Sequence, residues 1–524
     1  MGTASEKALT KLSATELATI IARGDVSAVE VVEAHIARIE QVNPALNAVV
    51  VKRYDEARAA ARAADDRRGW GEPLAPLHGV PITIKESLDL TGTPSTYGLT
   101  ARARTLAERD NVYVARMRAA GAIVLGKTNV SQLLLYIESD NPVYGRTNNP
   151  WNPARTSGGS SGGQAAILAA GGSPLGLGSD IGGSVRVPAS FCGIVSLKPT
   201  AGRMPDDSSF GMSPGQRAIV SQVAPMARIV DDLTLALQTM NGGNDPNVEP
   251  PMPLGDPTTV DVSKLRVAYY TDDKTLAVAP AVRRAVIEAA GMLAGRGAQV
   301  VEWQPPDVNA ALHVFYGILS ADGGRGAAEM VAGSTKDPRI ATLLRLARAP
   351  LPVNMTLRGA LAATGQRNTR QVLQAFGHRD TLHYWRLVEA QMDYQRRFLE
   401  ALDQDAGGPF DIIICPACAL PAFPHGASAD LLAGGGYATL YNVLGYPAGV
   451  VPLTRVQTDE ESNRKRSLDR MERTARAAEE GSAGLPVGVQ VVARPWREHV
   501  ALAAMRAIEA SARLRSDYPQ QPPL

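Results

Sequence analysis

The residues best suited to chemistry lie in one glycine-rich stretch, which runs from Thr156 to Thr200. Two serines in it directly follow paired glycines: Ser160 in GGSSGG and Ser184 in DIGGS. Glycine lets main-chain N–H groups approach a ligand closely and permits backbone angles with φ > 0. A serine hydroxyl beside a cluster of free N–H donors provides what attack on a carbonyl requires, a nucleophile and a site for the oxyanion. The stretch therefore suits acyl transfer.

A base is missing from that stretch, and Lys85 is the candidate upstream. The apolar run from Val80 to Ile84, in LHGVPITIKES, predicts a buried strand that Lys85 closes. Lysines are rarely buried without a reason. Two interpretations stay open: a lysine that reaches solvent from the strand end, or a desolvated lysine with a lowered pKa that acts as a base. His78, in the same apolar segment, is interpreted as structural.

Three further motifs are interpreted as unrelated to catalysis. Gly121 to Thr128 matches the phosphate-loop pattern G-x-x-x-x-G-K-[ST], but its central residues AIVL predict a strand instead of a flexible loop. Gly176-Leu-Gly178 lacks the third glycine of a dinucleotide fingerprint, because Ile181 stands there. Cys415 and Cys418 form a lone C-x-x-C without a second ligand pair, so we interpret both as packing residues. We expect no metal and no organic cofactor.

Helices and strands alternate along the chain. A strand over 265–270, a helix over 280–295 and a strand over 298–303 form a βαβ unit, and 410–415 predicts another buried strand. This alternation favours the α/β class, with a large mixed, mostly parallel twisted sheet covered by helices on both faces.

The N-terminal part predicts helices without chemistry of their own. Capping boxes at Ser13–Glu16 and Ser27–Glu30 predict two helices, the second ending near Gln41 because Asn43-Pro44 follows. The expected organisation is a helical scaffold over 1–70, a catalytic domain over 71–514 and a tail over 515–524. Within the catalytic domain we expect a helical cap at 336–400, interrupted near 349–352, and a charged insertion at 457–483. The insertion is expected to be a solvated helix or a mobile segment.

The cap contains a basic segment, 339–367. It combines Leu, Ala and Met with five arginines: Arg339, Arg345, Arg348, Arg358 and Arg367. Such a hairpin can lie on a membrane surface, and an ordinary pair of covering helices is the alternative.

Composition places the chain among ordinary globular proteins. Its 524 residues carry a formal charge of only +2, which gives no indication of a nucleic-acid partner. Three cysteines are too few for a disulfide framework and fit a reducing compartment. MGTASEKALTKL lacks the features of a signal peptide, and no apolar run of about 18 residues occurs. We expect a cytoplasmic protein, with peripheral membrane contact through 339–367 left open.

Three separated pieces of sequence together resemble the amidase signature family of serine hydrolases: Lys85 in GVPITIKES, Ser160 in GGSSGG and Ser184 in DIGGSVRVP. Other segments look shared with the family members that cleave fatty acid amides, among them GKTNVSQ, NPVYGRTNNPW, YNVLGYPAGVVPLT and GLPVGVQVVARPW. The resemblance extends from about 70 to 510. It departs at the N-terminus, where membrane-anchored members carry a spanning helix, and around 340–366, where relatives have a more hydrophobic membrane-binding cap.

The resemblance implies a Ser-Ser-Lys triad. Ser184 would be the nucleophile, Ser160 the relay on an unusual cis peptide bond, and Lys85 the base. The oxyanion hole would consist of the backbone N–H groups of Ile181, Gly182, Gly183 and Ser184. Asp180 and Arg186 flank the nucleophile and are expected to hold its loop by charge-assisted hydrogen bonds. Leu134, Leu135 and Ile137 are candidates for the acyl pocket, with core packing as the equal alternative.

We therefore expect a hydrolase of a hydrophobic acyl amide, with esters and carbamates left open as substrates. The alternatives within the family are an aryl-acylamidase, a peptide amidase and the amidase subunit of a tRNA-dependent amidotransferase. The alternative from another class is a non-catalytic binding protein that has kept the fold. The expected partner is a small-molecule amide, and a homodimer stays open.

Overall fold

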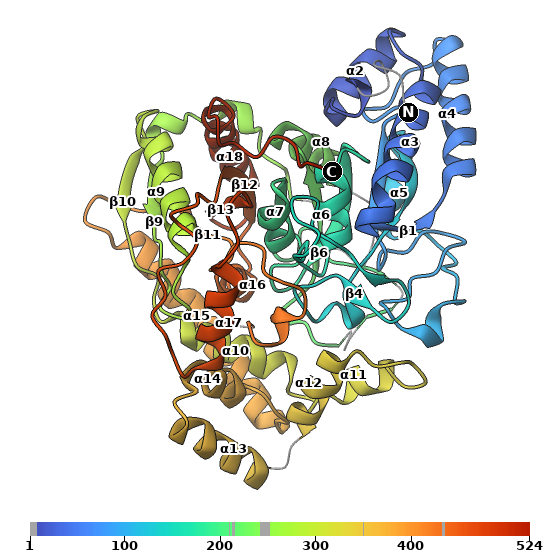
Figure 1. Ribbon diagram of the computed structural model, residues 1–524. Helices are drawn as coiled ribbons and strands as arrows, with labels where there is room; N and C mark the ends of the chain where they lie inside the picture. The colour runs from blue at the N-terminus through green and yellow to red at the C-terminus, as the bar shows by residue number, and fades with distance from the viewer. Residues whose placement is uncertain (1–7, 209, 212–214, 242–251, 349–350, 432–434) are drawn as a thin grey trace.

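The computed structural model describes residues 8–208, 210–211, 215–241, 252–348, 351–431 and 435–524. The strands within these residues are β1 (Val49–Lys52), β2 (Pro81–Lys85), β3 (Ile123–Thr128), β4 (Asp140–Asn141), β5 (Gly145–Arg146), β6 (Leu175–Asp180), β7 (Val195–Lys198), β8 (Gln222–Ala227), β9 (Arg266–Tyr269), β10 (Gln299–Glu302), β11 (Ile412–Pro416), β12 (Ala448–Arg455) and β13 (Pro486–Ala493). All but β4 and β5 form one 11-stranded sheet with the order β1-β3-β2-β6-β8-β7-β12-β13-β11-β9-β10 (Figure 1). The sheet is large and mixed, as the sequence predicts.

The sheet is not mostly parallel, which corrects the prediction. Its parallel pairs are β2–β3, β2–β6, β9–β10 and β9–β11. The other neighbours, including the central run β6-β8-β7-β12-β13-β11, are antiparallel. The βαβ unit at 265–303 is parallel, but the central strands of the sheet do not share this direction. A fully buried apolar strand has the same kind of sequence whether its neighbour in the sheet is parallel or antiparallel. The sequence therefore does not reveal the direction of pairing.

Helices cover both faces of the sheet. On one face lie α8 (Val230–Met240), α9 (Pro280–Ala294) and α18 (Glu498–Ala512), and on the other lie α6 (Gly162–Ala169) and α7 (Arg186–Cys192). Two sheet glycines show how closely these layers pack. A Cβ at Gly449 would lie 2.3 Å from Met505 of α18, and one at Gly488 would lie 3.2 Å from Ser190 of α7.

The remaining helices gather at two ends of the molecule (Figure 1). At the N-terminal end are α2 (Ala14–Arg23), α3 (Ala28–Leu46), α4 (Tyr54–Gly69) and α5 (Val112–Ala119). The opposite end carries α10 (Val308–Leu319), α11 (Arg325–Met330), α12 (Pro338–Arg348), α13 (Leu351–Ala363), α14 (Arg367–Ala375), α15 (Thr381–Asp403) and α17 (Arg470–Glu479), and the buried α16 (Gly436–Val443) lies between α10 and the sheet. The predicted cap at 336–400 is helical, and its interruption includes residues 349–350, which lie outside the described residues.

Both N-terminal capping boxes are confirmed. The hydroxyls of Ser13 and Ser27 accept from the third helical N–H, and each glutamate side chain accepts from the cap N–H. The predicted end of the second helix at Gln41 is wrong, because α3 continues to Leu46 with Pro44 inside its last turn. Asn43 stabilises this extended end: its Oδ1 accepts from the N–H groups of Ala48 and Val49, both at 2.8 Å. A side chain thus fixes the turn that proline was expected to break.

The charged insertion at 457–483 contains α17, which packs one face against the molecule and leaves the other exposed. Helix α17 buries Met471, Ala475 and Ala478, which lie on one face at i, i+4 and i+7. Arg464 forms ion pairs with Glu472 and with the buried Glu479, each at 2.8 Å. Arg476 and Glu480 also pair within the segment, and Glu460 and Arg470 join it to Arg284 and Asp430 of the rest of the molecule.

The motifs set aside in the sequence have structural positions. Gly126 and Lys127 lie within β3, and a Cβ at Gly126 would meet the Val51 carbonyl oxygen at 2.3 Å, so no phosphate loop exists there. Cys415 and Cys418 are buried free thiols whose burial raises their pKa values to about 11 and about 12. Within the described residues, no helix has both the length and the apolar character that crossing a bilayer requires.

Candidate active site

Lys85 is positioned by two parallel neighbouring strands. Because β2 and β6 run parallel, their carboxyl ends meet at the same edge of the sheet. Lys85 ends β2, Ser179 is the penultimate residue of β6, and Ser160 precedes Ser161, the N-cap of α6. Lys85 Nζ lies 2.7 Å from Ser160 Oγ, 3.0 Å from Ser179 Oγ and 3.3 Å from the Ser179 carbonyl oxygen. The structure therefore joins Lys85 to Ser160 across 75 residues of sequence.

Lys85 is buried, and it does not reach solvent from the strand end. It has no exposed surface, and no carboxylate in the described chain forms an ion pair with it. Burial lowers the pKa of its ammonium group to about 7, although the more distant charges of Asp206, Asp180 and Glu86 each raise it. Desolvation dominates because an unpaired ammonium loses its hydration inside the protein. A substantial fraction of Lys85 is therefore a neutral amine near pH 7.

Ser160 and Ser184 lie on adjacent loops. The Gly159–Ser160 peptide bond is cis. Its glycine fits where no side chain could, since a Cβ at Gly159 would lie 2.5 Å from the Glu138 nitrogen. The N–H of Ser161 donates to the carbonyl oxygen of Ser184 at 3.1 Å, which links the two loops. Ser184 is 8% exposed, and no hydrogen bond within the described residues occupies its hydroxyl.

The loop from Ile181 to Ser184 connects β6 to α7 and holds the expected oxyanion donors. Gly183 has φ +109, and a Cβ there would lie 2.8 Å from Ala438. Its N–H donates to Asp180 Oδ1 at 2.9 Å, so this expected donor has a partner in the structure. The N–H groups of Ile181, Gly182 and Ser184 have no acceptor within the described part of the chain. These three amides can therefore bind a developing negative charge.

Asp180 and Arg186 form a fully buried ion pair under this loop. Arg186 reaches both carboxylate oxygens, Nη2 to Oδ1 at 2.9 Å and Nε to Oδ2 at 3.1 Å. Burial alone would raise the pKa of Asp180, but the Arg186 guanidinium and the hydrogen bonds it donates hold that pKa well below its usual range. Asp180 also accepts from the N–H groups of Gly183 and Val185. The ion pair thus fixes the backbone around Ser184.

The structure adds residues that sequence reasoning missed. Ser179 contacts Lys85, and its one sequence signal is its place next to Asp180. Asn442 donates to Asp180 at 3.0 Å and accepts from Arg186 at 2.6 Å, while Gln490 accepts from Arg186 at 2.7 Å. These two amides lie more than 250 residues from the ion pair, so no local spacing could reveal them.

The candidate substrate residues border the site and also pack in the core. Leu134 and Leu135 are half-buried and contact an apolar cluster that includes Leu133, Tyr136 and Leu344. The backbone next to Leu134 and Leu135 lies against Gly159, which precedes Ser160. A Cβ at Gly159 would be 2.7 Å from the Tyr136 carbonyl oxygen.

Ile137 and His78 complete the predicted set. Ile137 is half-buried and packs on the main core. His78 is buried in the N-terminal region, where its Nε2 pairs with the Ala64 carbonyl oxygen at 2.9 Å. This contact fits the structural interpretation of His78.

Comparison with known proteins identifies the family of the chain. The amidase family model matches residues 30–502. The chain is 35% identical to fatty-acid amide hydrolase 1 of Sus scrofa over 448 residues, covering 83% of this chain and 75% of that protein. It is also 35% identical to indoleacetamide hydrolase of Bradyrhizobium diazoefficiens, over 95% of this chain and 86% of that protein.

Solved structures give the same result. A fatty acid amide hydrolase structure superposes with a TM-score of 0.81 and 28% identity, covering 97% of this chain and 86% of the other. The large mixed sheet, its helical layers and these matches support one assignment. The chain belongs to the amidase signature family, and it is an amide-cleaving hydrolase.

Proposed function

We propose that the protein is a serine hydrolase that cleaves hydrophobic acyl amides through Ser184, Ser160 and Lys85. Ser184 Oγ attacks the amide carbonyl and passes its proton through Ser160 to neutral Lys85. The oxyanion binds the N–H groups of Ile181, Gly182 and Ser184. Loss of one such donor typically costs about 3 kcal/mol of transition-state stabilisation.

Collapse of the tetrahedral intermediate needs a proton on the leaving nitrogen. Lys85 returns its proton through Ser160 to that nitrogen, and the amine leaves the acyl-enzyme. Water then attacks the ester carbonyl of acyl-Ser184, and the same two groups carry its proton. Coupling of base and acid matters for amides because an amine anion is a poor leaving group.

One observation carries this proposal: the fully buried Lys85 Nζ lies 2.7 Å from Ser160 Oγ, with its pKa lowered to about 7. Burial alone does not mark a base, because Lys127 is also buried. Lys85 differs in its contact with Ser160, whose loop is joined to the Ser184 loop by the hydrogen bond from the Ser161 N–H.

A fluorophosphonate probe tests the mechanism. We expect the probe to label Ser184 in the wild type, and we expect Ser184→Ala to lose both labelling and amide hydrolysis. Ser511→Ala, on α18, is the control and should keep both. Labelling at another serine, or full hydrolysis by Ser184→Ala, would show that the proposed nucleophile is wrong.

The preference for a hydrophobic acyl group is supported by the apolar surroundings of the loops. The half-buried Leu134 and Leu135 lie on one side, and the ring of Phe315 on α10 lies against Gly182, where a Cβ would be 3.1 Å away. Relatives of different specificity include the fatty-acid amide hydrolase named above and a subunit of glutamyl-tRNA(Gln) amidotransferase from Chloroflexus aurantiacus. The latter is 32% identical over 98% of this chain and 98% of that protein.

A kinetic panel of oleoyl, acetyl, anilide and carbamate substrates decides between these classes. We expect the highest kcat/KM for the oleoyl amide, and Leu134→Asp should lower that value far more than the value for the acetyl amide. A preference for the acetyl amide or the anilide would favour the other amidases.

For the segment 339–367, we propose peripheral contact of a cytoplasmic protein with an anionic membrane. Arg345, Arg348 and Arg367 are exposed and support this proposal. Arg339 does not, because it forms ion pairs with Asp337, Asp140 and Glu138. At low salt, the wild type should sediment with anionic liposomes, whereas Arg345→Gln/Arg348→Gln should stay in the supernatant. Equal behaviour of the two proteins would remove the proposal.

We also propose a homodimer, supported by an exposed apolar stripe on α15. The stripe consists of Leu382, Trp385, Met392 and Leu399, which are 53%, 61%, 63% and 40% exposed. These four side chains lie within an arc of about 100° around the helix axis. A two-fold axis next to Met392 would pair two antiparallel copies of the stripe and place Glu389 of each copy opposite Arg396 of the other. Such self-complementary charge suits a two-fold interface.

Light scattering and charge reversal test this interface. Trp385→Glu should convert a dimer into a monomer. Glu389→Arg should do the same, and Glu389→Arg/Arg396→Glu should restore the dimer. A monomeric wild type, or a dimer that tolerates Trp385→Glu, would contradict the proposal.

A further inference from the structure

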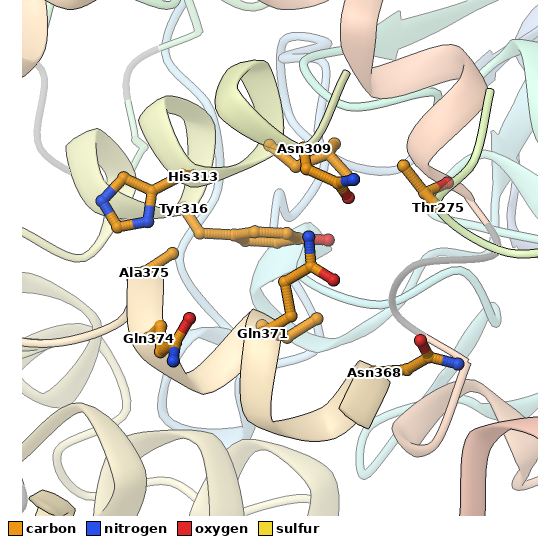
Figure 2. A pocket seen from close by; sticks show the side chains of 10 residues that line it. Thr275, Asn309, His313, Tyr316, Asn368, Gln371, Gln374 and Ala375 are labelled. Atoms are coloured by element: carbon orange, nitrogen blue, oxygen red, sulfur yellow. The ribbon is translucent and has the colours of Figure 1, made fainter. Parts of the chain in front are cut away.

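A cavity of about 200 Å³ lies between α10 and α14, outside the cluster of Lys85, Ser160 and Ser184 (Figure 2). The face of α10 that lines it carries Asn309, His313 and Tyr316, at i, i+4 and i+7, and α14 contributes Gln371 and Gln374. In Figure 2 the ring of Tyr316 extends from α10 between Asn309 and the amide of Gln371, with His313 and Gln374 farther to the left. The volume is several times the roughly 30 Å³ that one water molecule occupies in the liquid.

The lining of this cavity combines polar and apolar side chains and carries no carboxylate, lysine or arginine. His313 is the one titratable side chain other than Tyr316 in this lining. Burial lowers its pKa, as do the charges of Arg379 and Arg358, so the imidazole is neutral at pH 7. A charged ligand would lose hydration here without a lining side chain to form a direct ion pair with it. The cavity therefore favours an uncharged ligand.

The hydrogen-bonding groups of the lining narrow the ligand further. Each carboxamide side chain offers an N–H donor next to a carbonyl acceptor. Within the described residues, the side chains of Asn309, His313, Gln371 and Gln374 form no hydrogen bond with the protein. A ligand that itself presents adjacent donor and acceptor groups can pair with such side chains reciprocally. A small carboxamide has this arrangement, and the apolar side chains of Leu312 and Val372 can contact its hydrocarbon part.

The same helix touches the loop that carries Ser184. From α10, the Phe315 ring lies against Gly182, and Leu312 would lie 3.2 Å from a Cβ on Gly436 at the start of α16. In α16, the Thr439 hydroxyl donates to the Gly182 carbonyl oxygen at 3.2 Å. A ligand that fills the cavity would thus restrain α10. This helix supports the oxyanion loop directly through Phe315 and indirectly through its contact with α16.

We propose that this cavity is an accessory site for a small, uncharged carboxamide, distinct from the catalytic serine, and that its occupancy changes the turnover number by restraining α10. The binding step does not depend on the proposed triad. The effect on turnover uses only the amide hydrolysis that the family membership establishes.

Binding is tested on the full-length Ser184→Ala protein with δ-valerolactam, a stable cyclic amide. We expect saturation-transfer NMR to show binding of the lactam but not of valerate or pentylammonium. Gln371→Leu should weaken binding at least about tenfold, which equals about 1.4 kcal/mol. Asn309→Leu should act alike, and Arg370→Gln, on α14 outside the lining, should leave the affinity unchanged. Equal affinity in all variants, stronger binding of either ion, or no binding up to the solubility of the lactam would overturn the proposal.

Turnover is tested on the protein with Ser184 intact, using an acyl amide substrate and the same lactam. We expect the lactam to change kcat of the wild type. In Gln371→Leu the lactam should no longer change kcat. The thermal unfolding midpoint of this variant and its kcat without lactam should equal those of the wild type. Gln371→Glu is a second variant, which keeps the side-chain shape and adds a charge, and it should also abolish the change. Purely competitive inhibition that survives both substitutions would place the lactam at the catalytic serine and overturn the proposed coupling.

Discussion

Replacement of Lys85 by methionine tests the chemistry most directly. Methionine keeps most of the volume of the buried side chain but has no basic nitrogen. Removal of a general base that acts in the transition state typically lowers the rate by about 10²- to 10⁴-fold. We expect kcat/KM for an amide to fall by this amount in Lys85→Met, with the fold unchanged.

The pH dependence gives a sharper magnitude. With the pKa of Lys85 at about 7, the acid limb of kcat/KM in the wild type should have its midpoint near pH 7. The neutral fraction of such a lysine is about 90% at pH 8, about 10% at pH 6 and about 1% at pH 5. Activity should therefore fall roughly tenfold per pH unit below the midpoint. The residual activity of Lys85→Met should lack this limb.

The assay is kcat/KM for a soluble acyl amide between pH 5 and pH 9. Lys127 provides a matched control, because it is buried on the adjacent strand β3 and burial lowers its pKa to about 8. Lys127→Met should keep a limb near pH 7. A flat wild-type profile, an unchanged limb in Lys85→Met, or a limb that depends on Lys127 would refute the assignment of the base.

Three further predictions concern the charges around the site. Asp206→Asn removes a negative charge that raises the pKa of Lys85, so the acid limb of kcat/KM should move to lower pH, and a move to higher pH would contradict the electrostatic argument. Lys85→Met should become more stable relative to the wild type as the pH falls from 10 to 7, because the unfolded chain protonates Lys85 in this range and the folded protein does not. The difference in free energy of unfolding from urea titrations should grow by about 1.4 kcal/mol per pH unit, whereas a constant difference would show that the folded lysine is charged. Arg186→Met leaves the buried Asp180 carboxylate unpaired and should lower the free energy of unfolding by about 3–5 kcal/mol. Arg186→Met/Asp180→Asn should recover part of this loss in the same titrations, and no recovery would mean that the unpaired charge is not the cause.

The sequence alone was sufficient where a property depends on neighbouring residues. Paired glycines before Ser160 and Ser184 mark positions where the backbone approaches other groups closely, and the Cβ distances at Gly159 and Gly183 give the steric reason. The capping boxes depend on residues three apart and were predicted correctly. The family followed from three such local motifs, since their combination is rare.

The tertiary structure decided what depends on distant parts of the chain. The strand ending in Lys85 could be predicted, but the burial of its amine could not, because the atoms that exclude water from it come from β2, β6 and the loop of Ser160. The same holds for the engagement of the Gly183 N–H, since the acceptor capacity of Asp180 is shared among Arg186, Asn442 and the loop. Strand direction also stayed hidden, because a strand buried on both faces has the same apolar sequence whether its neighbour is parallel or antiparallel. Sequence thus determined which residues can react, and the folded chain determined the charge, partners and orientation with which they meet.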